Sequence, residues 1–379
     1  MPGNSLRAIV GGGSIGGLCA GLALYGLGAD VDVFEQNPGT MVGNSNVTRG
    51  AGIVVQQELL SLLRRHNAPP LPSTSCTQRR YLEPGGGNGQ TQSMPQSFTS
   101  WEAIYITLRA AFPETRYHIG AAMEGFENRA GGVGVDIVGR GRMDANLLIC
   151  ADGAQSATRR RLLPEVVSRY AGYIAWRGTV DETAAPAELA RFFDDTFTFS
   201  EARSGGHMLV YFIPGAHADA SEGHRRLNWV WYVRTGEDHL TDILTDRTGG
   251  VHSNSLQPGS ARDDRIAEFR ARSRRELHPR MAELIEISAE PFIQKIVDVV
   301  VPRTVFGRAV LLGDAAFVVR PHTAGATAKA ATEATLLAAS LLEAEFDIDR
   351  GLRGFESAQV RYGYELYRYG ARLGAQNGF

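Results

Sequence analysis

A glycine-rich turn joins two short apolar segments at the start of this chain. The run LRAIVGGGSIGG begins at Leu6 as an apolar strand and passes through Gly11, Gly13 and Gly16 into the helix-like LCAGLALYGLG. A second apolar strand, VDVFE, ends at Glu35. Glycines at this spacing allow a tight turn and close approach of the backbone to a pyrophosphate, and an acid after the second strand can bind a ribose hydroxyl. The segment therefore predicts a βαβ unit that binds a dinucleotide.

Two later segments repeat the pattern of an apolar strand followed by an acid. LLICADGAQSATRR carries Asp152 and Gly153, and AVLLGDAAFVVRPHTAGA carries Gly313 and Asp314. Ligands of open α/β sheets lie outside the carboxyl ends of the strands, so we expect the three segments to meet around one ligand. The first turn alone does not choose between NAD and FAD, because both place a pyrophosphate at a helix N-terminus.

In order and approximate spacing, these three fingerprints resemble those of the single-component flavoprotein aromatic hydroxylases related to para-hydroxybenzoate hydroxylase. The resemblance spans nearly the whole chain. The segments RGAGIVVQQ at Arg49, RYAGYIAWRG at Arg169 and GDAAFVVRPH at Gly313 look most like members that hydroxylate 2,6-dihydroxypyridine. The resemblance implies FAD as cofactor, NADH or NADPH as hydride donor, and attack of a flavin C4a-hydroperoxide, formed with O2, on a small electron-rich aromatic ring.

The resemblance also assigns residues to the cofactor. Arg49 would reach toward the flavin or the nicotinamide, Asp152 toward the flavin ribityl chain or the nicotinamide side, and Asp314 toward a ribityl hydroxyl. A helix N-cap is the alternative role for each Asp. The predicted cofactor-binding residues are Gly11, Gly13, Ser14, Ile15, Gly16, Glu35, Gln36, Arg49, Asp152, Gly153, Gly313, Asp314, Pro321, Gly325 and Ala326.

The chain departs from the family pattern at two places. Trp101 stands where many members carry an Arg that binds the flavin phosphates, so the phosphate charge must be met elsewhere. Gly325, Ala326 and Thr327 stand in place of the usual G-x-G-x-N, which alters the expected contacts to the flavin pyrimidine edge.

A base near the ring hydroxyl is expected, because phenols and hydroxypyridines become nucleophilic on partial deprotonation. Three candidates are predicted. His207 and Tyr211 share one face of the strand HMLVYFIP by alternation. His322 follows Pro321 in the segment that, by resemblance, lies near the isoalloxazine ring. The alternative for His207 is an ordinary histidine on a solvated sheet face.

The predicted fold is α/β, or α+β overall: a Rossmann-like FAD-binding domain, an interleaved antiparallel-sheet substrate domain and C-terminal helices. Aromatic and β-branched alternation from Tyr173 to Thr235 predicts that sheet, and the polar stretch from Leu82 to Ser97 predicts a loop or loose hairpin. Residues 263–288 are predicted as helix. The expected division is 1–75, 98–172 and 293–345 for FAD, 76–97 and 173–292 for the substrate, and 346–379 for the C-terminal helical segment.

Composition excludes several classes of protein. The 379 residues are 43% hydrophobic and 21% charged, with a formal net charge of −2, which offers no electrostatic footprint for nucleic acid. The first strand starts too early for a signal peptide to precede it, and no apolar run reaches the roughly 18 residues that span a bilayer. We therefore expect a cytoplasmic protein. Cys19, Cys76 and Cys150 are expected to be reduced and buried, and the scattered histidines predict no metal site.

Other flavoproteins remain as alternatives. Disulfide reductases carry a second glycine fingerprint and a C-x-x-x-x-C pair, which this sequence lacks. Halogenases carry W-x-W-x-I-P, of which only Trp229 and Trp231 are present. A hydroxylase of another phenolic or N-heteroaromatic ring, a flavoprotein reductase and a non-catalytic FAD-binding protein stay open. The mixture of tyrosines and arginines after Phe355 suits a protein interface, and indicates a possible homodimer.

Overall fold

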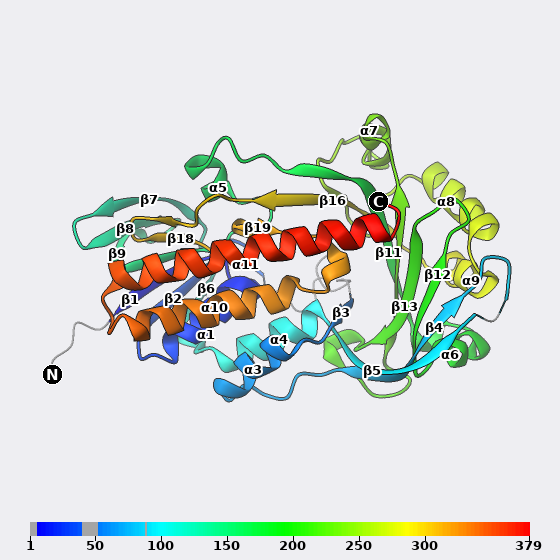
Figure 1. Ribbon diagram of the computed structural model, residues 1–379, viewed down its shortest axis with the longest axis horizontal. Coiled ribbons are helices and arrows are strands. Elements are labelled where there is room, and N and C mark those ends of the chain that lie inside the picture. Colours follow the sequence, from blue (N-terminus) through cyan, green and yellow to red (C-terminus); the bar gives the residue numbers. More distant parts are fainter. Residues whose placement is uncertain (1–5, 40–51, 88) are drawn as a thin grey trace.

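The computed structural model describes residues 6–39, 52–87 and 89–379. Two sheets lie toward opposite ends of the molecule, and a long helix runs past the first and ends beside the second (Figure 1). This arrangement confirms the predicted α/β class with a Rossmann-like unit, an antiparallel sheet and C-terminal helices. The residue boundaries of the two proposed domains stay a prediction.

The first sheet contains the glycine turn. Its strands follow the order β17 (Val305–Phe306), β18 (Ala309–Leu311), β10 (Leu147–Cys150), β1 (Arg7–Gly11), β2 (Asp30–Glu35) and β6 (Tyr117–Ile119). All neighbours pair in parallel except β17 with β18. The carboxyl ends of β1, β2 and β10 therefore lie at one edge, where the fingerprints begin.

Each face of this sheet is covered by a different layer. Ala8 and Val10 of β1 pack with a helical layer, whereas the intervening Ile9 packs against a small sheet, as strand alternation requires. The helices are α1 (Ile15–Tyr25), α3 (Gln57–Arg65), α4 (Trp101–Ala111) and α10 (Ala326–Glu343), and the small sheet contains β7 (Met123–Arg129), β8 (Gly132–Ile137) and β9 (Gly141–Ala145).

The second sheet has ten strands and is mainly antiparallel. Nine follow the order β15 (Ser255–Leu256), β16 (Phe292–Val300), β11 (Arg169–Asp181), β14 (Arg226–Arg234), β13 (His207–Ile213), β12 (Thr196–Glu201), β4 (Thr74–Leu82), β5 (Thr91–Ser100) and β3 (Gly52–Val54). The tenth, β19 (Phe317–Val318), lies within the third fingerprint segment and pairs with β16. The pairing of β16 with both β11 and β19 holds that fingerprint against the second sheet.

One face of the second sheet carries an apolar core, which includes Trp176, Trp229 and Trp231. The other face carries Tyr173, Tyr211 and Tyr232 and is directed toward the first sheet's ligand edge through His322. The helices of this half are α6 (Ala187–Phe193), α7 (Leu240–Ile243), α8 (Asp263–Glu276) and α9 (Pro279–Ile287).

The structure corrects the single helix expected over residues 263–288. Helix α8 ends at Glu276 and α9 begins at Pro279. Proline at the first position of a helix disfavours helical backbone in the residue before it, and the His278 side chain instead caps the Arg280 amide at 3.1 Å. Within the polar stretch from Leu82 to Ser97, residues 91–97 belong to β5, which pairs with β4 as a hairpin.

The remaining elements are short, apart from one. Helix α11 (Ile348–Gln376) packs along α10 and reaches the second sheet beside β11 (Figure 1). The others are α5 (Ala157–Leu162), η1 (Glu114–Arg116), η2 (Glu182–Ala184), η3 (Ala216–Ala218), η4 (Glu237–His239), η5 (Gly313–Ala315) and η6 (Pro321–Thr323). Within the described ranges, the helices are too short or too polar to cross a membrane.

Candidate active site

The first fingerprint forms a turn into which side chains would not fit. Gly12 has φ of +108°, and a Cβ there would lie 2.3 Å from the Ala151 carbonyl oxygen. A Cβ at Gly13 would lie 2.5 Å from the Tyr117 hydroxyl oxygen. Helix α1 follows with Ser14 as an N-cap that makes no side-chain hydrogen bond and with no acid in its first turn. These uncapped amides suit the pyrophosphate of a dinucleotide.

Glu35 lies beneath this turn, at the end of β2. The residue is 4% exposed, and its Oε2 accepts the Gly13 amide at 2.9 Å. Its Oε1 accepts the backbone and side-chain amides of Asn37 at 2.9 and 2.6 Å. The Tyr117 hydroxyl donates to the Gly13 carbonyl at 2.9 Å. Asn37 and Tyr117 were not predicted, and Tyr117 had no signal because 104 residues separate it from its partner.

The second fingerprint binds its own helix. Asp152 accepts the Ser156 hydroxyl at 2.6 Å and the Thr158 amide at 3.0 Å, at the start of α5. The N-cap of α5 is Ser156, so Asp152 supports this cap rather than forming it, and a contact of Asp152 with the flavin stays a prediction. Arg159 is 4% exposed and donates to the carbonyls of Ala154, Asp314 and Ala315. It therefore joins the second fingerprint to the third.

The third fingerprint rests on two buried charged residues of α10. Lys329 is 0% exposed, and its Nζ donates to Asp314 Oδ1 at 2.8 Å and to the Phe317 carbonyl. Glu333 accepts the Gly313 amide at 2.6 Å, and burial raises the pKa of Glu333 to about 7. The Asp314 side chain is 44% exposed. Lys329 and Glu333 were not predicted as site residues. Their spacing, four residues apart in an Ala-rich helix, places them on one helix face and was the sequence signal that could have identified them.

The three fingerprints fit FAD together. A Cβ built on Gly16 would lie 3.9 Å from the Gly313 Cα, so the first and third fingerprints touch. Helix α10 begins at Ala326 after Gly325, with no side-chain cap and no acid in its first turn. It thus presents a second uncapped N-terminus. Pro321 begins η6 next to it. Arg49 lies outside the described residues.

An aromatic cluster follows on the second sheet: Tyr173, His207, Tyr232, His322 and Phe379. The His322 ring centroid lies 4.5 Å from that of Tyr232 and 5.4 Å from that of His207. Phe379 stacks on Tyr173 at 4.1 Å. The structure thus brings together His207 and His322, which are 115 positions apart in the chain.

Both histidines of the aromatic cluster are neutral at pH 7. Burial lowers the pKa of His207 to about 4. Burial, with the charges of His207, Arg320 and Arg177, lowers the pKa of His322 to about 3. The Nε2 atom of His322 is buried and has no hydrogen-bond partner among the described residues. A neutral imidazole with a free nitrogen can accept a proton from a ring hydroxyl.

Tyr211 lies beside the aromatic cluster rather than in it. Its ring packs on Phe98 at 4.4 Å and on Phe197 at 5.1 Å. Burial raises the pKa of Tyr211, so its hydroxyl remains protonated at neutral pH. The side chain can donate or accept a hydrogen bond, but it is not ionised to act as a base.

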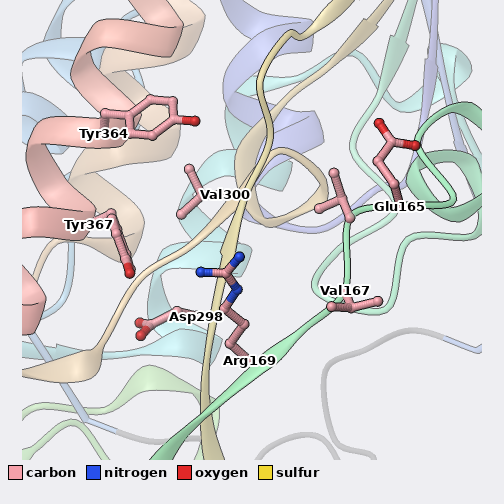
Figure 2. A pocket seen from close by; sticks show the side chains of 8 residues that line it. Glu165, Val167, Arg169, Asp298, Val300, Tyr364 and Tyr367 are labelled. Atoms are coloured by element: carbon pink, nitrogen blue, oxygen red, sulfur yellow. The ribbon is translucent and has the colours of Figure 1, made fainter.

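A cavity of about 200 Å³ opens elsewhere, between α11, β16 and the start of β11 (Figure 2). Its lining contains none of the fingerprint residues. Asp298 in its lining binds Arg320 at 3.0 Å, and the Arg320 guanidinium lies 5.9 Å from the centroid of the Tyr173 ring in the aromatic cluster. The lining residues are Glu165, Val166, Val167, Arg169, Asp298, Val300, Tyr364 and Tyr367.

Other predicted features are placed as follows. The described residues contain no group of three or more His, Cys, Asp or Glu side chains that could hold a metal ion. Cys19, Cys76 and Cys150 are buried and unpaired. Trp101, at the position of the family Arg, stacks on Tyr105 with ring centroids 5.2 Å apart.

Comparison with known proteins identifies the family. Residues 170–298, which contain most of the second sheet, match the family described as FAD binding domain-like. The 2,6-dihydroxypyridine 3-monooxygenase of Paenarthrobacter nicotinovorans is 33% identical over 369 residues, covering 94% of this chain and 88% of that relative. This chain belongs to the FAD-dependent aromatic hydroxylases.

Solved structures agree with the fold of this hydroxylase. The structure of 2,6-dihydroxypyridine-3-hydroxylase from Arthrobacter nicotinovorans matches it with a TM-score of 0.89 at 30% identity, covering 100% of this chain and 93% of that one. HpxO of Klebsiella pneumoniae, complexed with FAD and uric acid, matches with a TM-score of 0.75 at 23% identity over 97% of this chain and 88% of that one. The hydroxylase is thus a flavin monooxygenase whose fold is shared by an enzyme seen with FAD bound.

Proposed function

We propose that this flavin monooxygenase hydroxylates a hydroxypyridine such as 2,6-dihydroxypyridine, with O2 and with NADH or NADPH as hydride donor. The observation that carries the proposal is the pair of neutral, partly buried histidines in the aromatic cluster, with ring centroids 5.4 Å apart. The 33% identity to a 2,6-dihydroxypyridine 3-monooxygenase supports the substrate class.

The protein's own residues orient the ring and handle its proton. Tyr173 and Tyr232 offer apolar faces for stacking, and burial of the aromatic cluster excludes water. His322 and His207 are placed to accept the proton of a ring hydroxyl, and Tyr211 to hydrogen-bond the ring. FAD, when bound, supplies the oxygen chemistry.

The fingerprints would hold this FAD. The α1 and α10 N-termini would face its phosphates, and Glu35 a ribose hydroxyl. We propose that the partly exposed Asp314 binds a ribityl hydroxyl.

The first experiment is an absorbance spectrum of the purified protein, followed by oxygen uptake with NADH and NADPH against hydroxypyridines and hydroxybenzoates. We expect a yellow protein whose NAD(P)H oxidation accelerates with a dihydroxypyridine and yields a hydroxylated product. A yellow protein that responds to none of these rings would contradict the substrate class. A protein that cannot be reconstituted with FAD would contradict the cofactor assignment.

We further propose a cytoplasmic homodimer that associates through α11. On this helix, Tyr364 and Tyr369 are 37% and 44% exposed. Tyrosine is enriched at protein interfaces because its ring is apolar and its hydroxyl can still hydrogen-bond.

A further inference from the structure

Arg177 is a buried cation on the sheet face that carries the aromatic cluster. It lies on β11, paired across the sheet with Val230 and Phe292, and is 7% exposed. Alternation places its side chain on the same face as Tyr173 and away from Trp176, which packs in the opposite core.

The part of the chain that the structure describes supplies no counter-charge to this guanidinium. Within residues 6–39, 52–87 and 89–379, Arg177 forms no ion pair, and its Nε is buried without a hydrogen-bond partner. The other stretches of the sequence, 1–5, 40–51 and position 88, contain neither Asp nor Glu. Among the described residues, no carboxylate therefore forms an ion pair with Arg177.

The charge of Arg177 acts on the groups of the candidate site. It lowers the pKa of Tyr211 on β13, of Tyr232 on β14 and of His322 on η6, although burial raises the pKa of both tyrosines overall. The other cation that acts on His322, Arg320, is bound by Asp298 at 3.0 Å. Of the two described cations that act on His322, Arg177 is thus the one without a counter-charge.

A buried cation without a partner destabilises a folded protein, because its lost hydration is not replaced. Such a cost is typical of a binding site in which a ligand supplies the missing charge. The free Nε2 of His322 is a second unpartnered polar atom in the same region. Between aromatic rings, these groups suit a flat ligand that carries an anionic oxygen.

We propose that Arg177 binds the ring oxyanion of the substrate, so that the site takes a hydroxy-heteroaromatic ring in its deprotonated form. This inference rests on the proposed function and adds the ionisation state of the ligand. A guanidinium suits the role because it stays charged when buried and presents several N–H donors in one plane. The proton of the ring hydroxyl passes to His322 or His207, and Arg177 neutralises the oxyanion that is left on the ring.

The test is ligand binding to the oxidised holoenzyme and to its Arg177→Met variant. Each is titrated with 2,6-dihydroxypyridine and with 2,6-dimethoxypyridine, a neutral analogue that cannot ionise. We expect Arg177→Met to weaken binding of the dihydroxy ligand by about tenfold to a hundredfold and to leave binding of the dimethoxy analogue unchanged. The bound dihydroxy ligand should show the absorbance of its anion in the wild type alone.

Thermal unfolding provides a second readout. Removal of an unpaired buried charge should raise the unfolding temperature of ligand-free Arg177→Met, and 2,6-dihydroxypyridine should then stabilise the wild type more than the variant. Arg169→Met is the matched control, since Arg169 is exposed on the same strand. It should bind both ligands like the wild type.

The outcomes separate the two proposals. A wild type that neither binds nor hydroxylates any hydroxypyridine contradicts the proposed function. A wild type that does both, with an Arg177→Met variant of equal affinity, overturns the inference alone. If Arg177→Met does not retain FAD, the Arg177→Lys variant is used instead. The inference is supported if Arg177→Lys binds the dihydroxy ligand more weakly than the wild type, binds the dimethoxy analogue equally, and still shows the absorbance of the bound anion. Equal affinity in Arg177→Lys for both ligands, or loss of both affinities together, overturns it.

Discussion

Burial sets the pKa values of the two candidate base residues in this hydroxylase. His207 and His322 would titrate near neutrality in an unfolded chain, but their surroundings keep them neutral down to about pH 4 and about pH 3. A neutral imidazole is ready to accept a proton at pH 7, and it adds no positive charge to the site. Two different kinds of residue therefore supply the base and the positive charge in this region. His322 or His207 is the base, and Arg177 is the cation.

The two histidines are expected to differ in kinetic role. We expect the alanine variant of whichever histidine accepts the ring proton to lose about a hundredfold in kcat, with NAD(P)H oxidation uncoupled from hydroxylation. The alanine variant of the other should mainly raise the KM for the aromatic ring. Steady-state kinetics with product quantification measures both. If His207→Ala and His322→Ala both keep normal turnover and coupling, neither residue is the base.

The lowered pKa of His322 should also appear in the pH dependence of the unfolding free energy. A histidine whose folded pKa is lowered stabilises the fold fully above its unfolded pKa near 6.5, and that stabilisation is lost as the pH falls toward the folded value. Between pH 7 and pH 5, the wild type should lose about 2 kcal/mol of unfolding free energy relative to His322→Gln. Urea unfolding at the two pH values measures this difference. Parallel pH dependence of the two proteins would show that His322 is not buried as described.

At the scale of elements, α10 combines an uncapped N-terminus with the buried pair Lys329 and Glu333. The helix presents its first amides to the predicted cofactor, while these two side chains hold η5 from beneath through Asp314 and Gly313. The geometry of the third fingerprint therefore depends on side chains one to two turns further along the helix.

Glu333 should give the opposite pH signature to the histidines. Its folded pKa is raised to about 7, so the fold loses stability as the pH rises from the unfolded value of about 4.5 through 7. Glu333→Gln keeps an acceptor for the Gly313 amide and removes the titration. Between pH 5 and pH 8, the wild type should lose about 2 kcal/mol relative to Glu333→Gln in denaturant unfolding. The control Glu343→Gln, at the exposed end of the same helix, should show the same pH dependence of unfolding free energy as the wild type. If Glu333→Gln also shows the pH dependence of the wild type, Glu333 is ionised throughout this range and the prediction is wrong.

At the scale of the whole molecule, the site lies where two sheets meet. The third fingerprint leaves the first sheet at η5 and pairs with the second through β19 and β16, so His322 arrives against Tyr232 and His207. Helix α11 passes from α10 to the second sheet and brings Phe379 onto Tyr173. Both halves must therefore be docked before the aromatic cluster exists.

Association through α11 is open to a direct measurement. Sedimentation velocity at micromolar concentration should give a dimer for the wild type. Replacing Tyr369 by Ser should shift it toward monomer without changing the flavin spectrum, because this side chain is 44% exposed on the outer face of α11. A wild type that sediments as a monomer would rule out the proposed homodimer.

Several features were accessible from short stretches of sequence. The glycine turn, the strands that carry Asp152 and Asp314, and the alternation that aligns His207 with Tyr211 follow from steric limits and strand periodicity over a few residues. The fold class and the helix α10 were predictable for the same reason. The break between α8 and α9 was also readable in principle, because Pro279 acts on its immediate neighbours.

The composition of the site depended on distant parts of the chain. Tyr117 reaches the turn across 104 residues, and His207 meets His322 because β13, β14 and η6 pack together. In isolation the strand of Arg177 gives no sign that its cation will be buried without a carboxylate, since pairing and desolvation depend on every neighbouring element. Local backbone preferences thus determine where each fingerprint begins, whereas burial and charge balance, which set pKa values and ligand affinity, arise from packing between segments far apart in the sequence.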